Sequence, residues 1–457
     1  MVENGTLVLS GGANSMTNVS GNNILVRTNA TLTFGGGDTF GNHSITPLFT
    51  LTAEQGATIN NNGGYMNAIG DITLKGATLG SAGASTFAWS LKGLVTADGP
   101  VTSTISGSTI GLGAAAVTGT VFNVLDGAAA NDLNVTAVLA DGSGPSWPTA
   151  QASSLTKNGA GTMTLTAANT YTGGTRVNAG TLVLQDGLNN GTGVIQGALS
   201  VFSNSVVRLT TGASALGWNT ARVTTLNVDN SLVDATTLQH IWNMTGGVNL
   251  TGGQLRINNG VSATNAANWW EWGNSAVTTF ASANSSEISG RINVRADVTP
   301  TLSFTVADGA AATDLIVSAA ITEANAASPI NLAKSGAGLM LLSGTNLYKG
   351  TTTVSGGTLQ AGTTGAFGIN SAVSIGNAAG ATLDLNGFSN TIGSLAGGGA
   401  AGGEVKLGTA TLTFGGLNTT LTYAGTITGT GGLIKNGSGV QTLTGANSYS
   451  GGTVVNA

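Results

Sequence analysis

A polar, glycine-rich phrase occurs three times in this chain of 457 residues, and it constrains the fold more than any other feature. The copies begin at Lys157, Lys334 and Lys435 and read KNGAGTMTLTAANTYTGGTRVNAGTLVL, KSGAGLMLLSGTNLYKGTTTVSGGTLQ and KNGSGVQTLTGANSYSGGTVVNA. Internal duplication of this kind is typical of solenoids, in which each repeat needs its neighbours to bury its apolar face. We therefore expect stacked repeats rather than unrelated domains.

The duplication also predicts how the chain is organised. A second phrase, FNVLDGAAANDLNVTAVL from Phe122 and FTVADGAAATDLIVSAAI from Phe304, relates the first two modules and is missing from the third. Insertion or deletion of whole coils would produce such differences in length. We expect one continuous solenoid, a fragment of a longer chain, with modules at residues 1–179, 180–356 and 357–457.

Short segments with a large apolar residue at every second position predict β-strands with one face in the core. Examples are TLTF, which contains Leu32 and Phe34, and ATLDLNG, which contains Leu383 and Leu385. No window carries a capped helical stripe, so the fold class is all-β. Glycine and asparagine corners favour a β-solenoid over a sandwich, because they accept left-handed backbone angles. Coils stacked at roughly 4.8 Å would form a single elongated rod on the order of 100 Å long.

Composition excludes several classes of function. The chain has 14 Lys and Arg against 19 Asp and Glu, a net charge of −5, and no basic run, which argues against nucleic acid as a partner. It has no cysteine, which excludes disulfides and thiol chemistry, and His43 and His240 have no motif-spaced partner for a triad or zinc site. We predict no catalytic, metal or cofactor residue. No signal peptide and no apolar run of about 18 residues is present, so any export signal or membrane anchor is expected outside this chain.

Two positions recur in every copy of the motif and are interpreted as structural. An asparagine can bond to its own turn, and the tyrosine two residues later offers a ring that caps the apolar column. We expect the lysine at the head of each copy to lie solvated on a loop. The asparagine and tyrosine positions are Asn169, Tyr171, Asn346, Tyr348, Asn447 and Tyr449.

The last copy, with the residues before it, reads GTGGLIKNGSGVQTLTGANSYSGGTVVNA. It resembles the passenger-associated transport repeat, also called the autotransporter-associated β-strand repeat, of bacterial outer-membrane autotransporters. The resemblance implies a right-handed parallel β-helix that is exported and displayed at, or released from, the bacterial cell surface, with the repeat assisting folding during translocation. The second copy departs from the pattern, because Thr351 stands where the others have Gly174 and Gly452. We expect that corner to depend less on positive φ.

The segment NWWEWGN contains the candidate contact residues Trp269, Trp270 and Trp272. Tryptophan rings stack on sugars and anchor interfaces, so the expected partner is a surface glycan or a host or cell-surface protein. Neighbouring residues of a strand point to opposite faces, so either Trp269 or Trp270 should be exposed. The alternative is a loop that buries these rings against the flank of the solenoid.

A weaker candidate is the charged segment EISGRINVRAD, in which Glu287, Arg291, Arg295 and Asp297 share parity and are expected on one strand face. Some β-helix polysaccharide lyases are similar in using an outward arginine beside acidic calcium ligands. A surface ladder of opposite charges explains the same pattern, and no calcium-type spacing of Asp accompanies it.

The sequence thus predicts a secreted or surface-displayed structural stalk or adhesin segment without catalysis. One alternative is a self-assembling extracellular fibre, a homopolymer in which subunits stack end to end through uncapped solenoid ends that lie in phase with the repeat. A further alternative is a polysaccharide lyase or hydrolase on the same scaffold.

Overall fold

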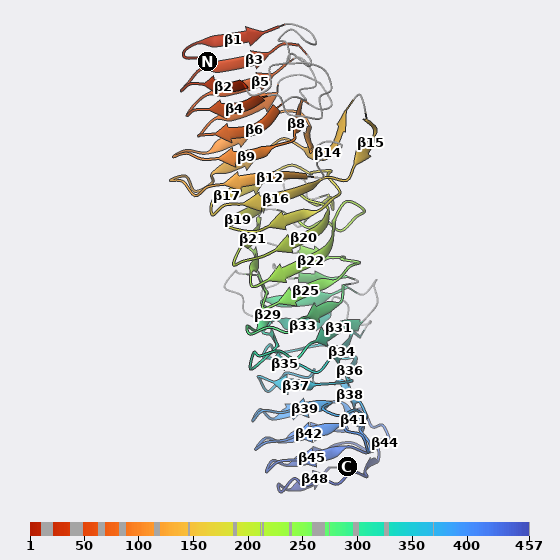
Figure 1. Ribbon diagram of the computed structural model, residues 1–457. Coiled ribbons are helices and arrows are strands. Elements are labelled where there is room, and N and C mark those ends of the chain that lie inside the picture. Colours follow the sequence, from red (N-terminus) through yellow and green to blue (C-terminus); the bar gives the residue numbers. More distant parts are fainter. Residues whose placement is uncertain are drawn as a thin grey trace. The chain divides into compact units, whose positions relative to one another are not determined.

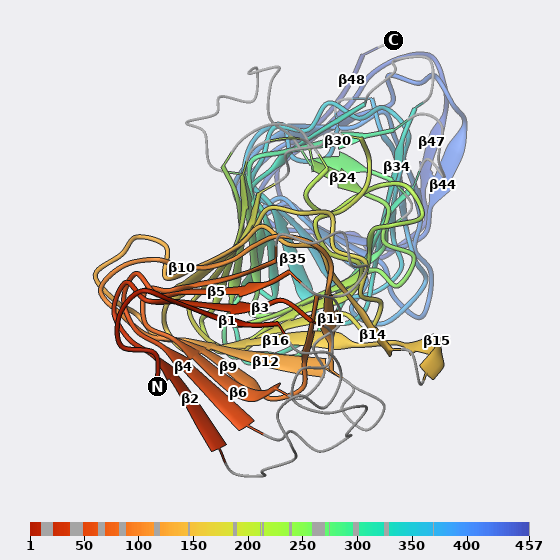
Figure 2. The same ribbon diagram turned by 90° about the horizontal axis from the view of Figure 1, so that it is seen from above.

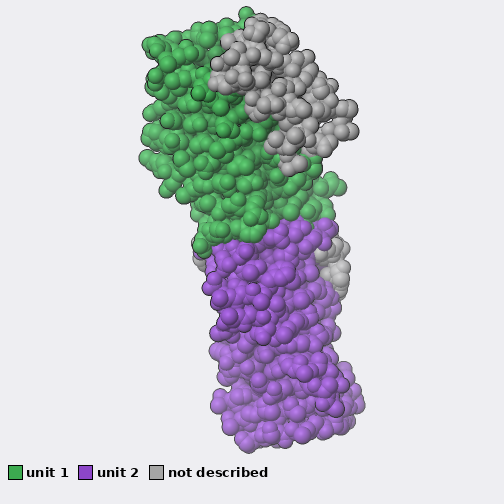
Figure 3. All heavy atoms as spheres, viewed as in Figure 1, with its two compact units in different colours: residues 1–224, 231–236 green, residues 225–230, 237–457 purple. Residues whose placement is uncertain are grey.

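A computed structural model describes most of the chain. The described residues are 1–10, 22–36, 49–62, 69–81, 88–113, 119–144, 147–185, 190–210, 212, 214–236, 240–257, 270–273, 275–295, 301–323, 329–368 and 370–456. They form short strands, β1 to β48, and these ranges contain no helix. Figure 3 colours two compact units, residues 1–224 with 231–236, and residues 225–230 with 237–457. The three predicted modules remain a prediction.

In the first unit, strands stack in parallel into three sheets, as Figures 1 and 2 show for successive coils. One sheet contains β1 (Thr6–Leu9), β3 (Thr31–Phe34), β5 (Thr58–Asn61), β7 (Thr78–Ser81), β10 (Ser103–Ile105), β13 (Leu133–Val135), β17 (Thr162–Leu165), β19 (Thr181–Gln185), β21 (Val206–Thr210) and β23 (Leu232–Ala235). A second contains β2 (Asn22–Val26), β4 (Phe49–Ala53), β6 (Ile69–Leu74), β9 (Leu94–Ala97), β12 (Gly119–Val124), β16 (Ser154–Asn158), β18 (Thr175–Val177) and β20 (Gly197–Val201). The third contains β8 (Trp89–Leu91), β11 (Ile110–Leu112) and β14 (Leu139–Gly144), with β15 (Trp147–Gln151) antiparallel to β14.

The second unit repeats this plan. One sheet contains β26 (Gln254–Ile257), β29 (Ser286–Ile288), β32 (Leu315–Val317), β35 (Leu339–Leu342), β37 (Thr358–Ala361), β39 (Thr382–Asp384), β42 (Glu404–Lys406) and β45 (Thr426–Thr428). A second contains β22 (Val223–Asp229, from Thr225 on), β25 (Val248–Thr251), β28 (Val277–Thr279), β31 (Thr301–Val306), β34 (Asn331–Ser335), β36 (Thr351–Val354), β38 (Ala372–Ile375), β41 (Ser394–Gly397), β44 (Leu421–Tyr423) and β47 (Gln441–Leu443). The third side has β24 (His240–Trp242), β27 (Trp270–Trp272), β30 (Arg291–Val294) and β33 (Ala320–Glu323), then separately β40 (Asn390–Thr391), β43 (Leu412–Phe414), β46 (Leu433–Lys435) and β48 (Thr453–Val455).

The period-two pattern places the core as predicted. Leu32, Phe34, Leu383 and Leu385 are all buried, and Leu182 on β19 is fully buried beside Met163 of the neighbouring coil. Because parallel pairing stacks each inward residue on the one before it, the apolar side chains form columns along each unit. The expected all-β parallel β-solenoid is confirmed.

One corner requires glycine, and another does not. Gly357, which precedes β37, has a φ of 59°, and an added Cβ would lie 2.5 Å from the carbonyl oxygens of Gly336 and Gly338. Gly174 has a φ of 86°, whereas Thr351 at the matching place is not among the residues with positive φ. The second copy therefore makes this corner without a left-handed residue, as expected.

Candidate functional site: the repeated lysine–asparagine–tyrosine motif

The lysine of each copy points into the core. Lys157 and Lys334 have no exposed surface, and Lys435 is 8% exposed. In all three copies the lysine is paired with a phenylalanine on one side and a valine on the other: Phe122, Lys157 and Val177; Phe304, Lys334 and Val354; Phe414, Lys435 and Val455. The prediction that these lysines are solvated on loops is wrong, because each occupies an inward position of a strand, where its aliphatic stem packs in the apolar column.

The lysine ammonium groups bond to backbone carbonyls at the corners. Nζ of Lys157 donates to the carbonyl oxygens of Gly159 at 2.6 Å and Ala179 at 2.9 Å. Nζ of Lys334 likewise donates to Gly336 at 2.7 Å and Gly356 at 2.8 Å. The two acceptors in each pair belong to successive coils. Each of these lysines therefore joins one coil to the next through its side chain.

An aspartate from the duplicated DGAAA phrase balances the charge of each of these two lysines. Burial lowers the pKa of Lys157 and of Lys334 to about 8, while the negative charges of Asp132 and Asp314 act in the opposite direction. Asp132 accepts hydrogen bonds from the amides of Gly127 at 2.9 Å and Thr162 at 2.7 Å, which fixes its carboxylate in the corner. The sequence predicted only a polar turn for the duplicated phrase, but the phrase also supplies the carboxylate that lies near the buried lysine.

The third copy lacks this aspartate. The amide of Val440, five residues after Lys435 as Thr162 is five after Lys157, donates to the Thr420 hydroxyl at 3.2 Å. Lys435 donates to the carbonyl oxygen of Gly437 at 2.7 Å. Its strand β46 also belongs to the third side of the solenoid, whereas β16 and β34 belong to the second sheet of their units. The third copy therefore keeps the stack of Phe, Lys and Val although its lysine lies in a different sheet from the lysines of the first two copies.

The motif asparagines connect coils through their side-chain amides. Oδ1 of Asn169 accepts from the amide of Leu139 at 2.7 Å, and its Nδ2 donates to the carbonyl oxygen of Val194 at 2.8 Å. Asn346 makes the same pair of bonds, from Ile321 at 2.9 Å and to Ala366 at 2.6 Å, and Asn447 accepts from Ile427 at 2.9 Å. Asn169 and Asn346 therefore each bond to the coil before and the coil after their own.

The motif tyrosines close the same corner. In each copy the tyrosine hydroxyl is hydrogen-bonded to the threonine four residues later, at 2.6 Å for Tyr171, 2.7 Å for Tyr348 and 2.7 Å for Tyr449. Burial raises the pKa of Tyr171 and Tyr348 well above the ordinary tyrosine range. These hydroxyls stay protonated and serve the fold.

The tryptophan segment lies largely inside the second unit. Trp270 and Trp272 on β27 are 0% and 1% exposed. Their indole N–H groups donate to the carbonyl oxygens of Ser289 at 3.1 Å and Ser275 at 2.7 Å. Trp269 lies outside the described residues. The burial of Trp270 and Trp272 leaves no ring face open to a sugar. The rings are buried, as in the structural alternative, but they lie on strand β27 of the solenoid and not on a loop against its flank.

The charged segment does not form one strand face. Glu287 on β29 accepts from the Ser318 hydroxyl at 2.8 Å, whereas Arg291 on β30 donates from Nε to Thr322 at 3.0 Å. Gly290, with a φ of 96°, turns the chain between them, so the expected single face is wrong and the two residues belong to different sheets. The Arg295 guanidinium lies 3.6 Å from a Glu271 carboxylate oxygen, and Asp297 falls outside the described residues.

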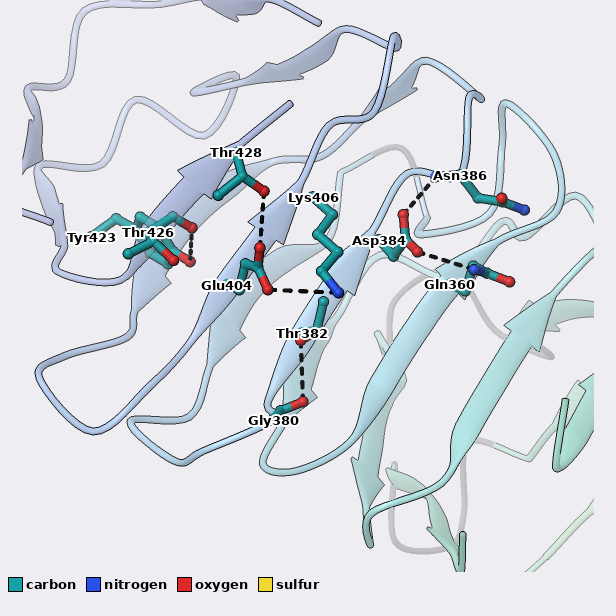
Figure 4. Close-up of polar contacts among 10 residues, drawn as sticks. All are labelled: Gln360, Gly380, Thr382, Asp384, Asn386, Glu404, Lys406, Tyr423, Thr426 and Thr428. Atoms are coloured by element: carbon teal, nitrogen blue, oxygen red, sulfur yellow. Dashed lines mark hydrogen bonds and ion pairs between the residues drawn. The ribbon is translucent and has the colours of Figure 1, made fainter. Parts of the chain in front are cut away.

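A polar ladder covers the outer face of β37, β39, β42 and β45 (Figure 4). Gln360 donates to Asp384 at 3.0 Å, and Thr428 donates to Glu404 at 2.9 Å. Nζ of Lys406 lies 3.7 Å from a Glu404 oxygen. The first two contacts join neighbouring strands, and the last lies within β42. No group of three or more His, Cys, Asp or Glu that could hold a metal ion occurs within the described part of the chain.

Stacked parallel strands, joined by polar side chains that bond to the backbone of adjacent coils, define the class of this protein as a β-solenoid repeat protein. The passenger-associated-transport-repeat family matches it at residues 155–184, 332–361 and 433–457, which are the three copies described above. The chain therefore contains three passenger-associated transport repeats, as the sequence predicted, and these repeats support its assignment as an autotransporter passenger. Its expected location, extracellular or at the bacterial cell surface, agrees with this assignment.

A curated relative supports the same assignment. The chain is similar to the Adhesin BmaC autotransporter of Brucella suis biovar 1 (strain 1330), with 45% identity over 127 residues. The match covers 27% of this chain and 4% of that protein, so the chain spans a small part of its relative. No solved structure matches the chain. Across the described ranges, no helix is long and apolar enough to cross a membrane.

Proposed function

We propose that this chain is a non-catalytic segment of a surface-displayed adhesin, in which the solenoid acts as a stalk that presents binding elements. The observation that carries the proposal is the use of the motif's polar atoms. The side chains of Lys157, Asn169 and Tyr171 all bond within the fold, to backbone carbonyls and amides or to a neighbouring hydroxyl. Groups used in this way hold coils together and are not available for a substrate.

The name of the relative adds a second line of support. It is called an adhesin, and the region shared with this chain is rich enough in identity to indicate a similar use at the cell surface. The enzyme alternative depends on the charged segment, and the corner at Gly290 separates Glu287 from Arg291. That separation speaks against the arrangement that the lyase alternative requires.

The proposal is tested by displaying the chain on bacteria through a heterologous translocator. Cells that carry the chain should bind host-cell monolayers or immobilised extracellular glycoproteins more than cells that carry the translocator alone. In parallel, the purified chain is incubated with acidic and neutral polysaccharides in the presence of calcium. New reducing ends or unsaturated products would contradict the non-catalytic assignment, and equal binding by both cell types would contradict the adhesin assignment.

A further inference from the structure

A chain of buried amide groups crosses several coils of the second unit on the third side of the solenoid. There, the sheet that ends at β33 and the sheet that begins at β40 are separate. In the two coils between them, the third side consists of residues 346–348 and 365–367, which lie outside the strands. Buried backbone groups still need partners at such a gap, so side chains have to supply some of them.

Asn346 and Asn390 carry this amide chain. The amide of Ile321 on β33 donates to Oδ1 of Asn346 at 2.9 Å, and Nδ2 of Asn346 donates to the carbonyl oxygen of Ala366 at 2.6 Å. The amide of Ala366 then donates to Oδ1 of Asn390 at 3.0 Å. The bonds run in one direction through four successive coils, from the coil of β33 to the coil of β40. Hydrogen bonds aligned in this way polarise and strengthen one another.

Asn390 lies between the second and third matched copies of the repeat, yet it bonds as a motif asparagine does. Its Nδ2 donates to the carbonyl oxygen of Phe388 at 2.9 Å, as Nδ2 of Asn169 donates to that of Ala167 at 3.0 Å, in both cases two residues earlier. Asn390 is 3% exposed, and the buried Ile392 stands where the motif has its tyrosine. Asn390 therefore continues the amide chain beyond the second copy.

Buried hydroxyl and ammonium groups link the same coils. The Thr352 hydroxyl is hydrogen-bonded to the hydroxyls of Tyr348 at 2.7 Å and Ser371 at 2.6 Å, and all three residues have no exposed surface. Nζ of Lys334 donates to the carbonyl oxygen of Gly356 in the next coil. A buried network that is fully bonded is rigid, and breaking one member leaves others unsatisfied. Opening one of these coils therefore carries a cost in its neighbours.

We propose that the amide chain through Asn346 and Asn390 makes the coils from β33 to β40 bear tension as one unit. This inference rests on the proposed stalk function and gives that stalk a mechanical part. A stalk that is held at a target is pulled along its stack, which is the direction of the hydrogen bonds between its parallel strands. Coils that contact only their neighbours can peel off one at a time, because the stability of a solenoid is a sum over adjacent repeats. Bonds that continue across four coils make these coils open together.

Joint opening is tested first in the parent chain, by hydrogen exchange in increasing concentrations of urea. The backbone amides of Ile321 and Ala366 report the two ends of the amide chain, because each donates to one of its asparagines. We expect both amides to exchange with the same free energy of opening and the same dependence on urea, as members of one cooperative unit do. Clearly different values for the two amides overturn the proposal.

A variant then separates joint opening from a local bond. Asn390→Ala removes the acceptor of the Ala366 amide, so that amide should exchange at least about tenfold faster. The amide of Ile321 should also exchange faster, although it lies three coils before Asn390. Asn377→Ala is the matched control, since the exposed Asn377 accepts from the amide of Ala401 in the next coil at 2.8 Å; both rates should stay within about twofold of the parent. Faster exchange confined to Ala366 in the Asn390→Ala chain overturns the joint opening.

Tension is tested directly by pulling the full chain by its two ends in optical tweezers. Residues 320–391 should be released in a single step of roughly 250 Å of extended chain. Asn390→Ala should divide this step or lower its force, and Asn377→Ala should leave it unchanged. Release coil by coil in the parent chain overturns the load-bearing unit, while the adhesin function, which is read from binding to host cells, stands. A chain that opens in one step but binds no host cell keeps this inference and loses the adhesin function.

Discussion

Nζ of Lys334 lies 2.8 Å from the carbonyl oxygen of Gly356, which is 22 residues further along the chain. Lys157 stands in the same relation to Ala179, at 2.9 Å and the same separation. A lysine inside an apolar column is normally costly, because the charged form loses its hydration. Here carbonyl acceptors from two coils and a nearby aspartate offset that cost. The lysine side chain thereby forms hydrogen bonds that join successive coils inside each repeat.

Removing the ammonium group of Lys157 should loosen this connection. Lys157→Met keeps an unbranched apolar side chain between Phe122 and Val177. It removes the donor to the carbonyl oxygens of Gly159 and Ala179 and the charge that Asp132 faces. We expect a loss of about 1–3 kcal/mol in local stability, read from hydrogen exchange of the amides of β16 and β18. Lys435→Met is the matched control, since the Lys435 ammonium bonds to the carbonyl oxygen of Gly437 in its own coil and, among the described residues, has no bridge to the next coil; a larger effect there would contradict the bridging role.

The buried lysines also predict how stability depends on pH. Their pKa is about 8 in the folded chain, against an ordinary value near 10.4 in the unfolded chain. Between these values the unfolded state binds more protons, so the free energy of unfolding should rise with pH from about 8 to about 10. Below pH 8 both states are protonated, and these lysines then add no pH dependence.

Above about pH 10 the tyrosines reverse the trend. Burial holds the pKa of Tyr171 and Tyr348 above the ordinary range, so the folded state keeps protons that the unfolded state loses, and stability falls. Urea unfolding at a series of pH values should therefore show a maximum near pH 10. The double variant Lys157→Met with Lys334→Met should lose the rise, and a rise that persists in it would assign the effect to other groups.

The asparagine bridge can be tested at Asn169. Asn169→Ala removes the side-chain acceptor of the Leu139 amide, while the carbonyl oxygen of Val194 keeps the bond from the Asn169 backbone amide at 3.1 Å. The variant should therefore cost about 1–3 kcal/mol for the Leu139 amide if it remains unsatisfied. Asn178→Ala is the control, because Asn178 forms a half-buried bond with Asn158 on the outer face at 2.9 Å and should cost less than about 1 kcal/mol. Equal losses of thermal stability in the two variants would contradict the role of Asn169 in joining coils.

Two glycines with similar φ values distinguish the cost of a left-handed backbone from the cost of a steric clash. Gly357 has a φ of 59° and no room for a Cβ, whereas Gly380 has a φ of 79° with no atom within 4 Å of that position. Gly380→Ala should therefore lose only the left-handed backbone cost of about 1–2 kcal/mol. Gly357→Ala should lose more, because its Cβ would also lie 2.5 Å from Nζ of Lys334. Similar unfolding midpoints for the two variants would contradict the collision.

The strands could be predicted from sequence because parallel stacking leaves one face of each strand in water, so apolar residues such as Leu32 and Phe34 alternate with polar ones. The inward lysine was missed although the same alternation contained it: Leu155 and Lys157 share parity, as do Leu332 and Lys334. A charged side chain suggests a solvated position, whereas its place in the alternation indicates an inward one. The sequence could not show that backbone carbonyl oxygens at the corners lie within hydrogen-bonding distance of the lysine Nζ.

The prediction from alternating positions was wrong where a corner interrupted the strand. Glu287 and Arg291 are four residues apart and would share a face on an unbroken strand, but Gly290 has a positive φ and ends β29. In the sequence, Gly290 was the signal that could have indicated this corner.

The lysine stack of the third copy has a consequence for how such genes change length. Its strand lies on another side of the solenoid, yet Phe414 and Val455 flank Lys435 as their counterparts flank Lys157 and Lys334. Recombination between two copies of the repeat therefore joins coil surfaces that already fit each other. Gain or loss of DNA between two copies would then keep a phenylalanine and a valine on either side of the buried lysine.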